Sequence, residues 1–229
     1  MTTFSVVATP IGNMADITMR ALEVLKKADL VLCEDTRMTK RLLDHYDIKV
    51  ETMSYHVHSK LSRQTEIIDL IKEGKNIALV SDAGTPGISD PGIELVRLIR
   101  EQFAKEISEG LLKIQSIPGP SALTASIAVA GVPCADFSFL GFLPHKKGRE
   151  TLFKEISNSE RTVIFYESPH RIMKTLDSLI KFCPHKNVTI ARELTKIFEE
   201  VVAGTAGEVK SYFEKNADKV RGEFVVFVY

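Results

Sequence analysis

Short apolar runs alternate with segments of helical periodicity through the first 120 residues or so of the chain. Each run has the length and the β-branched content of a buried strand, and a segment with apolar residues three or four positions apart follows it. The expected strands cover 4–8, 30–33, 52–55, 77–80 and 113–117, and the expected helices cover 17–28, 37–45, 63–73, 92–99 and 122–130. Such alternation is typical of a parallel sheet with helices on both faces, so we expect an α/β fold.

The second half of the chain departs from this regular order. Its expected strands cover 137–143, 162–166, 188–191 and 222–229, and its expected helices cover 150–157, 207–215 and a segment that starts at Pro169. Ser168 suits the N-cap of that last helix, because serine caps well and proline is favoured at the first helical position. The Gly-Val-Pro turn at 131–133 marks a boundary. We therefore expect a domain at 1–131 with a five-stranded, mostly parallel sheet, and an α+β domain at 132–229 with a mixed or antiparallel sheet.

Charge and cysteine usage limit the class of protein. Lysine plus arginine equals aspartate plus glutamate at 30 each, so any RNA binding must come from local patches. Cys33, Cys134 and Cys183 are widely separated, which favours reduced thiols in a cytosolic protein over a disulfide framework or a zinc site. No apolar stretch approaches about 18 residues, and the N-terminus enters a strand pattern without a signal peptide. We expect a soluble, cytoplasmic protein without a bound metal.

A loop rich in glycine and proline, Ser-Asp-Ala-Gly-Thr-Pro-Gly-Ile-Ser-Asp-Pro at 81–91, separates the expected strand at 77–80 from the next helix. Open α/β sheets bind ligands at such places, just beyond the carboxyl ends of parallel strands. Glycine lets the backbone approach a ligand closely, and Asp82 adds a carboxylate. No Lys-Ser or Lys-Thr follows the glycines and their spacing differs from the dinucleotide fingerprint, so neither common nucleotide loop is indicated. A purely structural turn is the alternative.

Polar loops follow four of the expected strands of the first domain. They cover 9–13, 34–37, 81–91 and 118–122. Because the carboxyl ends of parallel strands meet at one edge of the sheet, we expect these loops to gather on a single rim.

Several motifs occur in order along nearly the whole chain. They are Thr-Pro-Ile-Gly-Asn at 9–13, Cys-Glu-Asp-Thr-Arg at 33–37, Ser-Tyr-His at 54–56, the 81–91 loop, Ile-Pro-Gly-Pro-Ser-Ala at 117–122, Phe-Tyr-Glu-Ser-Pro-His-Arg at 165–171, Ala-Arg-Glu-Leu-Thr-Lys at 191–196 and Gly-Glu-Phe at 222–224. Together they resemble the bacterial 16S ribosomal RNA (cytidine-2′-O)-methyltransferases, of the tetrapyrrole-methylase-like (class III) methyltransferase superfamily.

This resemblance implies a two-domain α/β fold, a homodimer, and S-adenosylmethionine bound in the cleft between the domains. The implied reaction methylates a ribose 2′-hydroxyl of a cytidine in the decoding region of 16S ribosomal RNA, in the small ribosomal subunit, with neither membrane nor DNA as a partner. Two features depart from the family pattern. Gly87 stands where a larger apolar residue is expected, and the sequence ends at its last strand, where family members carry a further tail that we expect to affect RNA affinity.

The cofactor carries its own activated methyl group, so the chain must hold a sulfonium, an adenine and an amino-acid end. Asp82 and the backbone from Gly84 to Ile88 are expected at the amino-acid end, and the residues from Ser121 onward offer the free amides of a helix start. By family position, the strand ends of the second domain supply a further wall, although a core role is an equal alternative there. The expected cofactor contacts are Pro10, Asp82, Gly84, Thr85, Ile88, Ser121, Ala122, Phe165, Tyr166, Ala191, Leu194, Gly222 and Glu223.

A ribose hydroxyl is a poor acid, so a base or a positioning group is expected. The candidates for this role are Glu34, Asp35, His56, Glu167, Glu193 and Lys196, and the predicted catalytic set is Glu34, Arg37, His56 and Lys196. The Glu34-Asp35 pair is favoured as the group that orients Arg37, because an acid beside arginine stays ionised.

Basic residues near these motifs are candidates for phosphate contacts, with a solvated surface charge as the alternative for each. The predicted RNA contacts are Arg37, Lys40, Lys146, Lys147, Arg149, Arg171, Arg192 and Lys196.

Three classes of function remain open. The first is the ribosomal RNA 2′-O-methyltransferase, the second a tetrapyrrole or other small-molecule methylase of the same superfamily, and the third a non-catalytic ribosome-binding module. Binding of S-adenosylhomocysteine separates the first two classes from the third. Methyl transfer to small ribosomal subunits, but not to porphyrin-like acceptors, separates the first from the second.

Overall fold

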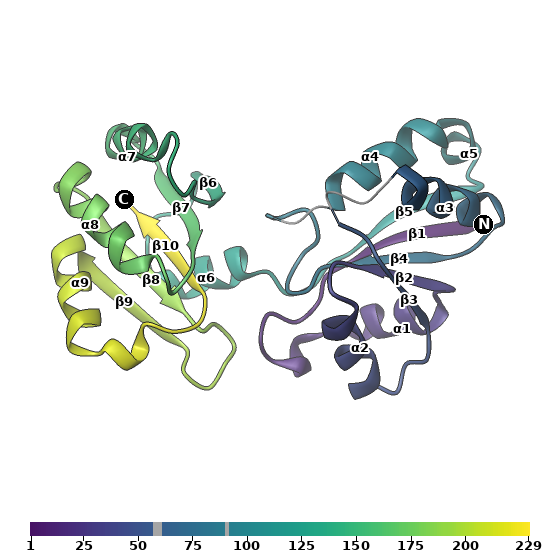
Figure 1. Ribbon diagram of the computed structural model, residues 1–229, viewed down its shortest axis with the longest axis horizontal. Coiled ribbons are helices and arrows are strands. Elements are labelled where there is room, and N and C mark those ends of the chain that lie inside the picture. The colour runs from purple at the N-terminus through teal and green to yellow at the C-terminus, as the bar shows by residue number, and fades with distance from the viewer. Residues whose placement is uncertain (57–60, 90–91) are drawn as a thin grey trace. The chain divides into compact units, whose positions relative to one another are not determined.

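The computed structural model describes residues 1–56, 61–89 and 92–229. The chain divides into two compact units, an N-terminal unit of Met1–Ser121 and a C-terminal unit of Ala122–Tyr229 (Figure 1). The last two residues of the 81–91 loop lie outside the described residues. Among the described residues, every helix is too short or too polar to cross a membrane.

The N-terminal unit contains a five-stranded sheet with the order β3-β2-β4-β1-β5, and every pairing in it is parallel. Its strands are β1 Thr2–Val7, β2 Leu30–Cys33, β3 Glu51–Ser54, β4 Ile77–Val80 and β5 Leu112–Ile117. Its helices are α1 Met19–Lys27, α2 Thr36–His45, α3 Leu61–Lys72, α4 Gly92–Gln102 and α5 Ala104–Ser108, with a short 3-10 helix at Met14–Asp16. The predicted α/β class and parallel sheet are confirmed.

Helices cover both faces of this sheet. In Figure 1, α1 and α2 lie below the strands, and α3, α4 and α5 lie above them. Leu25 and Leu43 pack with Val31 on the first face, whereas Ile67 and Leu95 belong to the core of the second face. The central strands β2 and β4 are buried at every position, so they read as continuous apolar runs rather than as an alternating pattern.

Neighbouring strands β1 and β4 send their connections to opposite faces. The chain leaves β1 toward α1 and leaves β4 toward α4, and these helices lie on different sides of the sheet (Figure 1). The two loops therefore part at the carboxyl ends of adjacent strands. This is the topological switch point at which open α/β sheets bind ligands.

The C-terminal unit contains a mixed sheet with the order β6-β7-β10-β8-β9. Only the β6–β7 pairing is parallel among those of the described residues. Its strands are β6 Phe137–Phe142, β7 Thr162–Glu167, β8 Asn187–Arg192, β9 Glu200–Thr205 and β10 Phe224–Val228. Its helices are α6 Ala122–Ala130, α7 Arg149–Asn158, α8 Ile172–Phe182 and α9 Ala206–Lys215, with a short 3-10 helix at Ala217–Lys219. The predicted mixed sheet is confirmed.

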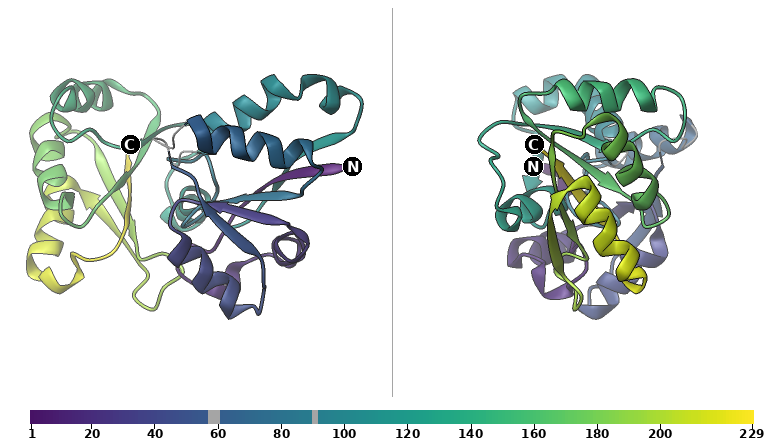
Figure 2. Two further views of the ribbon diagram at one scale, coloured as in Figure 1. Left: turned by 45° about the vertical axis from the view of Figure 1, so that its right-hand side comes forward. Right: turned by 90° about the vertical axis from the view of Figure 1, so that its left-hand side faces the viewer.

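Helices α7, α8 and α9 cover one face of the second sheet, and Figure 2 (right) shows α8 and α9, in green and yellow, in front of the strands. Phe153, Leu176 and Phe213 from these helices pack around Phe165 and Val226 of the sheet. Helix α6 contacts β8 and β10 and, among the described residues, supplies nothing to that core, so it covers the opposite face.

The two units of the structure divide between Ser121 and Ala122, at the start of α6. The boundary expected from the sequence lies after residue 131. The buried residues of α6 are Leu123, Ser126 and Ala130. The contacts of α6 with β8 and β10 explain why this helix belongs to the C-terminal unit.

The structure of the C-terminal unit differs from the sequence-based expectation at one strand and at the start of one helix. Strand β9 was missed, because it is an edge strand whose residues alternate between exposed and half-buried positions. Helix α8 begins at Ile172 rather than at Pro169, and Arg171 occupies its N-cap. The Ser168 carbonyl accepts hydrogen bonds from the amides of Arg171 and Ile172, and the Ser168 amide donates to the Glu167 carboxylate at 2.9 Å. Residues 168–171 therefore form a turn before the helix.

Candidate functional site

Two loops at the switch point are joined by their backbones. Thr9 and Gly84 exchange two hydrogen bonds, at 2.9 Å from the Thr9 amide and 3.0 Å from the Gly84 amide. The buried Thr9 hydroxyl also donates to the Ser81 carbonyl at 2.9 Å. These contacts fix the ends of β1 and β4 against one another.

Gly84 is required by two features of its position. Its φ is +84°, in the left-handed region, and a Cβ built on it would lie 3.3 Å from Cγ2 of Ile11. The same Cβ would lie 3.8 Å from the Pro120 carbonyl oxygen, and the Thr85 hydroxyl donates to that oxygen at 3.1 Å. The loops after β1, β4 and β5 therefore meet closely, and the predicted gathering of these loops is confirmed.

The loop after β2 is tied to the same rim by Asp82. Its Oδ1 accepts a hydrogen bond from the Asp35 amide at 3.0 Å. Asp35 caps helix α2 and binds Arg37 through both carboxylate oxygens, at 3.0 Å from Nε and 2.7 Å from Nη2. The side-chain hydrogen bonds from Arg37 hold the pKa of Asp35 at about 2. Asp35 is therefore ionised and orients Arg37.

A polar hollow of about 450 Å³ opens at the carboxyl ends of β2, β3 and β4. It is lined by Glu34, Asp35, Thr36, Arg37, Ser54, His56 and Asp82. The predicted residues Glu34, Arg37 and His56 thus come together with Asp82, although they belong to three separate motifs. Ser54 and Thr36 were not predicted as lining residues, and their only signal in the sequence was their position inside two of those motifs. Carboxylates and hydroxyls arranged in this way can bind the hydroxyl groups of a sugar.

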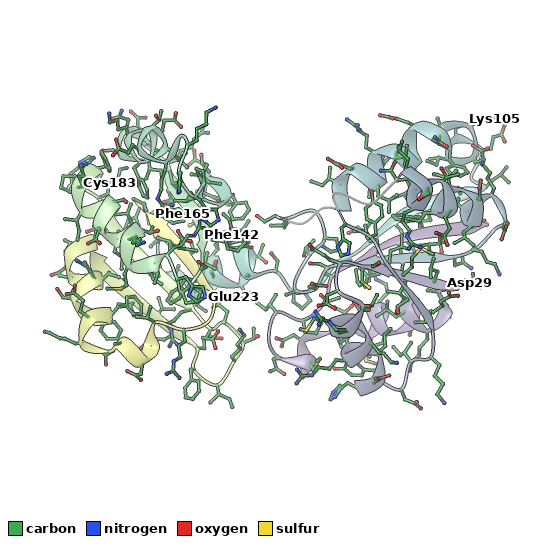
Figure 3. The ribbon with its side chains drawn as sticks, in the orientation of Figure 1. Asp29, Lys105, Phe142, Phe165, Cys183 and Glu223 are labelled. Carbon is green, nitrogen blue, oxygen red and sulfur yellow. The ribbon has the colours of Figure 1, made fainter. Side chains whose placement is uncertain are left out.

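The predicted cofactor residues of the C-terminal unit share one edge of its sheet. Strand β10 runs antiparallel between β7 and β8, and Phe224 at its start pairs with Glu167 and Arg192 at their ends. Tyr166, Ala191, Leu194, Gly222 and Glu223 lie in or next to these strand ends. Glu223 and Phe142, which ends the neighbouring strand β6, are labelled in Figure 3.

Tyr166 is the aromatic residue of this edge. Burial raises the pKa of its phenol, and the Leu123 amide hydrogen-bonds to it. Its ring contacts Phe139 and Phe142, with centroids 5.0 Å and 5.5 Å away. The side chain of Phe165, by contrast, points into the core of the α7–α9 face and is completely buried (Figure 3). The core role that the sequence left open is therefore the one that the Phe165 side chain has.

Gly222 and Lys196 lie against the same acid, Glu193. Gly222 has φ of +76°, and a Cβ there would lie 1.8 Å from Oε1 of Glu193. The Lys196 ammonium lies 2.8 Å from that oxygen and 3.9 Å from Oε2 of Glu223. Lys196 is therefore held in an ion pair within the loop that joins β8 to β9.

Apart from Lys196, which is half-buried in its ion pair with Glu193, the predicted RNA contacts fall into two groups. Lys40, Lys146, Lys147 and Arg37 are exposed. Arg149, Arg171 and Arg192 are largely buried, with side-chain exposures of 16%, 15% and 5%.

Buried acids and carbonyls explain the second group. Arg149 and Arg171 flank the carboxylate of Glu167, and Arg192 donates to the Phe198 carbonyl at 3.1 Å and lies 3.4 Å from Glu200. These three arginines therefore have partners within the C-terminal unit, and their contact with phosphate stays a prediction. Glu167, which was also a candidate base, is fully buried in the same ion pairs.

Two predicted cofactor residues, Ser121 and Ala122, lie on either side of the division between the units. Ser121 is buried at the end of the N-terminal unit, and Ala122 opens α6 in the C-terminal unit. Pro10, Thr85 and Ile88 are half-buried on the rim of the first sheet. In the described part of the chain, no three His, Cys, Asp or Glu side chains are grouped so that they could hold a metal ion.

Comparison with known proteins identifies relatives of the whole chain. The family of Tetrapyrrole (Corrin/Porphyrin) Methylases matches residues 3–210. Ribosomal RNA small subunit methyltransferase I of Halalkalibacterium halodurans is 44% identical over 99% of this chain and 75% of its own length. The protein of the same name from Thermotoga maritima is 44% identical over 96% of this chain and 95% of its own length.

Solved structures share the fold at lower identity. The methyltransferase CobJ superposes with a TM-score of 0.69 at 19% identity, covering 100% of this chain and 94% of its own. The cobalt precorrin-4 methyltransferase CbiF gives a TM-score of 0.67 at 18% identity, covering 99% and 94%. The family match and the near full-length relatives together show that the chain is a methyltransferase that belongs to the tetrapyrrole (corrin/porphyrin) methylase family.

Proposed function

We propose that this protein transfers the methyl group of S-adenosylmethionine to the ribose 2′-hydroxyl of a cytidine in the decoding region of 16S ribosomal RNA, within the small ribosomal subunit. Relatives that carry the name ribosomal RNA small subunit methyltransferase I and cover nearly all of the chain support the RNA substrate. The observation that carries the proposal is the polar hollow beside the switch point, because it brings together motif residues of the kind that sugar recognition needs.

The residues of the rim fit the cofactor. S-adenosylmethionine supplies a methyl group already activated on a sulfonium, so the chain has to bind and orient the reactants. A side chain at Gly84, whose backbone is joined to that of Thr9, would crowd Ile11, and glycine is expected where a backbone approaches a ligand closely. The half-buried carboxylate of Asp82 supplies the negative charge that a sulfonium favours.

The acceptor ribose occupies the polar hollow in this proposal. Asp35, with a pKa of about 2, is too weak a base to take a proton near neutral pH, and its part is to hold Arg37 toward the RNA backbone. The exposed carboxylate of Glu34 and the imidazole of His56 remain as the groups that accept or position the hydroxyl proton. Lys196 acts from its ion pair with Glu193 as a positioning charge.

The edge of the C-terminal unit supplies the remaining cofactor contacts. Tyr166, with its neighbours Phe139 and Phe142, offers an aromatic surface for the adenine. Ala191, Leu194 and Gly222 lie in or next to the adjoining strand ends and complete this wall in the proposal. A homodimer, in the cytoplasm, completes the proposal.

A tetrapyrrole methylase is the second candidate, because solved structures of that kind share the fold. The charge of the hollow argues against it. Among the described residues that line it, Glu34, Asp35 and Asp82 supply three carboxylates and Arg37 supplies the one arginine. A ring that bears several carboxylates would be repelled by such a site.

Methyl transfer to isolated ribosomal subunits tests the proposal. The purified protein is incubated with radiolabelled S-adenosylmethionine and small subunits that lack the modification, and primer extension at low nucleotide concentration locates a 2′-O-methyl group. We expect label on one cytidine of the decoding region and none on uroporphyrin. Label on the porphyrin alone would establish the second candidate. Binding of S-adenosylhomocysteine without transfer to either acceptor would contradict both.

A further inference from the structure

A buried carboxylate organises the end of β7. The side chain of Glu167 is 0% exposed. It accepts hydrogen bonds from the Ser168 amide at 2.9 Å and from the Thr175 hydroxyl at 2.7 Å. Arg171 lies 2.6 Å from one carboxylate oxygen and Arg149 lies 3.8 Å from the other. An isolated carboxylate would be very costly in such a place, and these partners compensate its burial.

Both arginines also reach a second segment of the chain. Arg171 donates from Nη1 to the Leu143 carbonyl at 2.8 Å, and Arg149 donates from Nη1 to the Pro144 carbonyl at 3.0 Å. The other nitrogen of Arg149, Nη2, donates to the Thr175 hydroxyl at 2.7 Å. Arg171 therefore links the Glu167 carboxylate to the Leu143 carbonyl, and Arg149 links the Thr175 hydroxyl to the Pro144 carbonyl. We call Glu167, Thr175, Arg149 and Arg171 the clamp.

The segment held in this way is short and basic. Leu143 is buried at its start, and the Arg149 amide bonds to the Lys146 carbonyl at 3.2 Å to close a turn at its end. Between these fixed points His145, Lys146 and Lys147 are exposed. We call these three residues the basic loop. The two guanidinium groups and the one carboxylate of the clamp together carry a net charge of +1, next to the basic loop.

The buried ion pairs of Glu167 with Arg149 and Arg171 indicate a function other than stabilising the fold. A buried ion pair generally adds little net stability, and apolar residues of similar volume often replace it without loss. Guanidinium groups, however, have fixed geometry and can hold two acceptors at once. The clamp therefore fixes the position of the basic loop by binding two backbone carbonyls of the segment before it. Apolar side chains could not bind these carbonyls.

We propose that the clamp positions the basic loop as a preformed contact for the RNA backbone, with Glu167 as the positioning residue and Lys146 and Lys147 as the groups that touch phosphate. This inference rests on the proposed function, since it needs an RNA substrate. A loop ordered before binding loses less conformational entropy when it meets the RNA, and lysine contacts to phosphate set register without reading sequence.

Salt-dependent binding to unmodified small ribosomal subunits tests the proposal. The double variant Lys146→Gln/Lys147→Gln removes two phosphate contacts, so we expect affinity to fall about tenfold at low salt and the slope of log affinity against log salt to fall by roughly 1.5. Lys154→Gln removes an equally exposed charge from α7, outside the basic loop, and is expected to leave the slope unchanged.

Arg171→Lys tests the clamp itself, because it keeps the charge but loses the fork that reaches both Leu143 and Glu167. We expect affinity to fall about threefold to tenfold, with a reduced salt slope. Added to the double lysine variant, Arg171→Lys is expected to cause no further loss, because the loop no longer has a contact to position. Thr175→Val, which removes the hydroxyl between Glu167 and Arg149, provides a second variant with the same expected signature if Arg171→Lys fails to fold.

The possible failures are distinguishable. A full additional loss from Arg171→Lys in the double variant, or an unchanged salt slope in the clamp variants, would show that the clamp only supports the fold. An unchanged slope in Lys146→Gln/Lys147→Gln would overturn the RNA contact. Failure of the wild-type protein to bind small subunits at all, with normal affinity for S-adenosylhomocysteine by calorimetry, would instead overturn the proposed function.

Discussion

Polar residues follow the strands of both sheets, but the two units use them in different ways. In the N-terminal unit they line an open hollow: Glu34 is exposed after β2, and the Arg37 side chain is 88% exposed. In the C-terminal unit Glu167 at the end of β7 and Arg192 at the end of β8 are buried and paired. Similar positions in the sequence therefore give a surface for ligands in one unit and an internal ion network in the other.

Sheet topology explains this difference. In the parallel sheet the loops part toward helices on opposite faces, so the strand ends beneath them stay uncovered. In the mixed sheet a neighbouring strand, β10, starts between the ends of β7 and β8, and the 143–148 segment and the β8–β9 loop return over them. A polar residue after a strand indicates a binding rim only where the chain does not come back over it.

The largest effect that this comparison predicts is on stability. Glu167→Ala would leave Arg149 and Arg171 buried without a counter-charge, and we expect the free energy of unfolding to fall by about 3–5 kcal/mol. Glu34→Ala, at an exposed position after β2, is the matched control, with a change within about 0.5 kcal/mol. The chain has no tryptophan, so urea unfolding is followed by circular dichroism. Equal effects of the two substitutions would remove the distinction between the units.

Backbone packing on the N-terminal rim predicts a smaller effect. Gly84→Ala and Gly110→Ala both place alanine at positive φ, and each is expected to cost about 1–2 kcal/mol of stability. Only at Gly84 does the added methyl group meet the neighbouring loop, at Ile11, whereas nothing lies within 4 Å at Gly110. We therefore expect a loss of affinity for S-adenosylhomocysteine of about tenfold in calorimetry for Gly84→Ala alone. Equal loss in both variants would show that the rim responds to global stability and is not itself the site.

Asp82 tests whether the rim acts by charge. Asp82→Asn keeps an oxygen that can accept the Asp35 amide, so the tether of 3.0 Å can persist while the negative charge is lost. A charge pair about 4 Å apart in water is worth roughly 1 kcal/mol, so we expect about fivefold weaker binding of the sulfonium S-adenosylmethionine. S-adenosylhomocysteine, whose neutral thioether lacks the sulfonium charge, is expected to bind with nearly unchanged affinity. Equal weakening of both ligands would assign Asp82 to loop structure instead.

The elements of the N-terminal unit were largely predictable from the sequence. The expected strands at 30–33 and 77–80 coincide with β2 and β4, because central strands of a parallel sheet give continuous apolar runs, and the short length and β-branched residues of these runs favour a strand. The hollow was predictable in part: Glu34, Arg37, His56 and Asp82 follow strands that end at one edge. Short helix α5 was not predicted, because five residues are too few to show a helical period.

The C-terminal unit was less predictable for a physical reason. A basic residue on the surface and a basic residue in a buried pair look the same in a sequence. The partners of Arg171 and Arg149 that decide the matter, Leu143 and Thr175, lie 28 and 26 residues away. Edge strand β9 gave too weak a pattern, since half of its residues face solvent. Long-range contacts of this kind determine burial, and local periodicity carries no information about them.

The smallest predicted effect concerns the surface ion pair between Asp35 and Arg37 in the hollow. Arg37→Gln removes the guanidinium donors but keeps the backbone amide at 2.8 Å, so we expect the pKa of Asp35 to rise from about 2 part of the way toward its ordinary value of 3.8. Because the folded pKa lies below the unfolded one, the stabilisation is present above about pH 4 and is lost as the pH falls toward 2.

Carbon NMR of the Asp35 carboxyl group measures this shift directly. The variant and the wild-type protein should then differ in acid stability only within that window of pH, and only slightly, since the pair is exposed. An Asp35 that titrates near 4 in the wild-type protein would mean that the pair does not persist in solution. Asp35 would then join Glu34 and His56 as a group able to accept the ribose proton, and the described part of the N-terminal rim would contain no fixed ion pair to compare with the clamp.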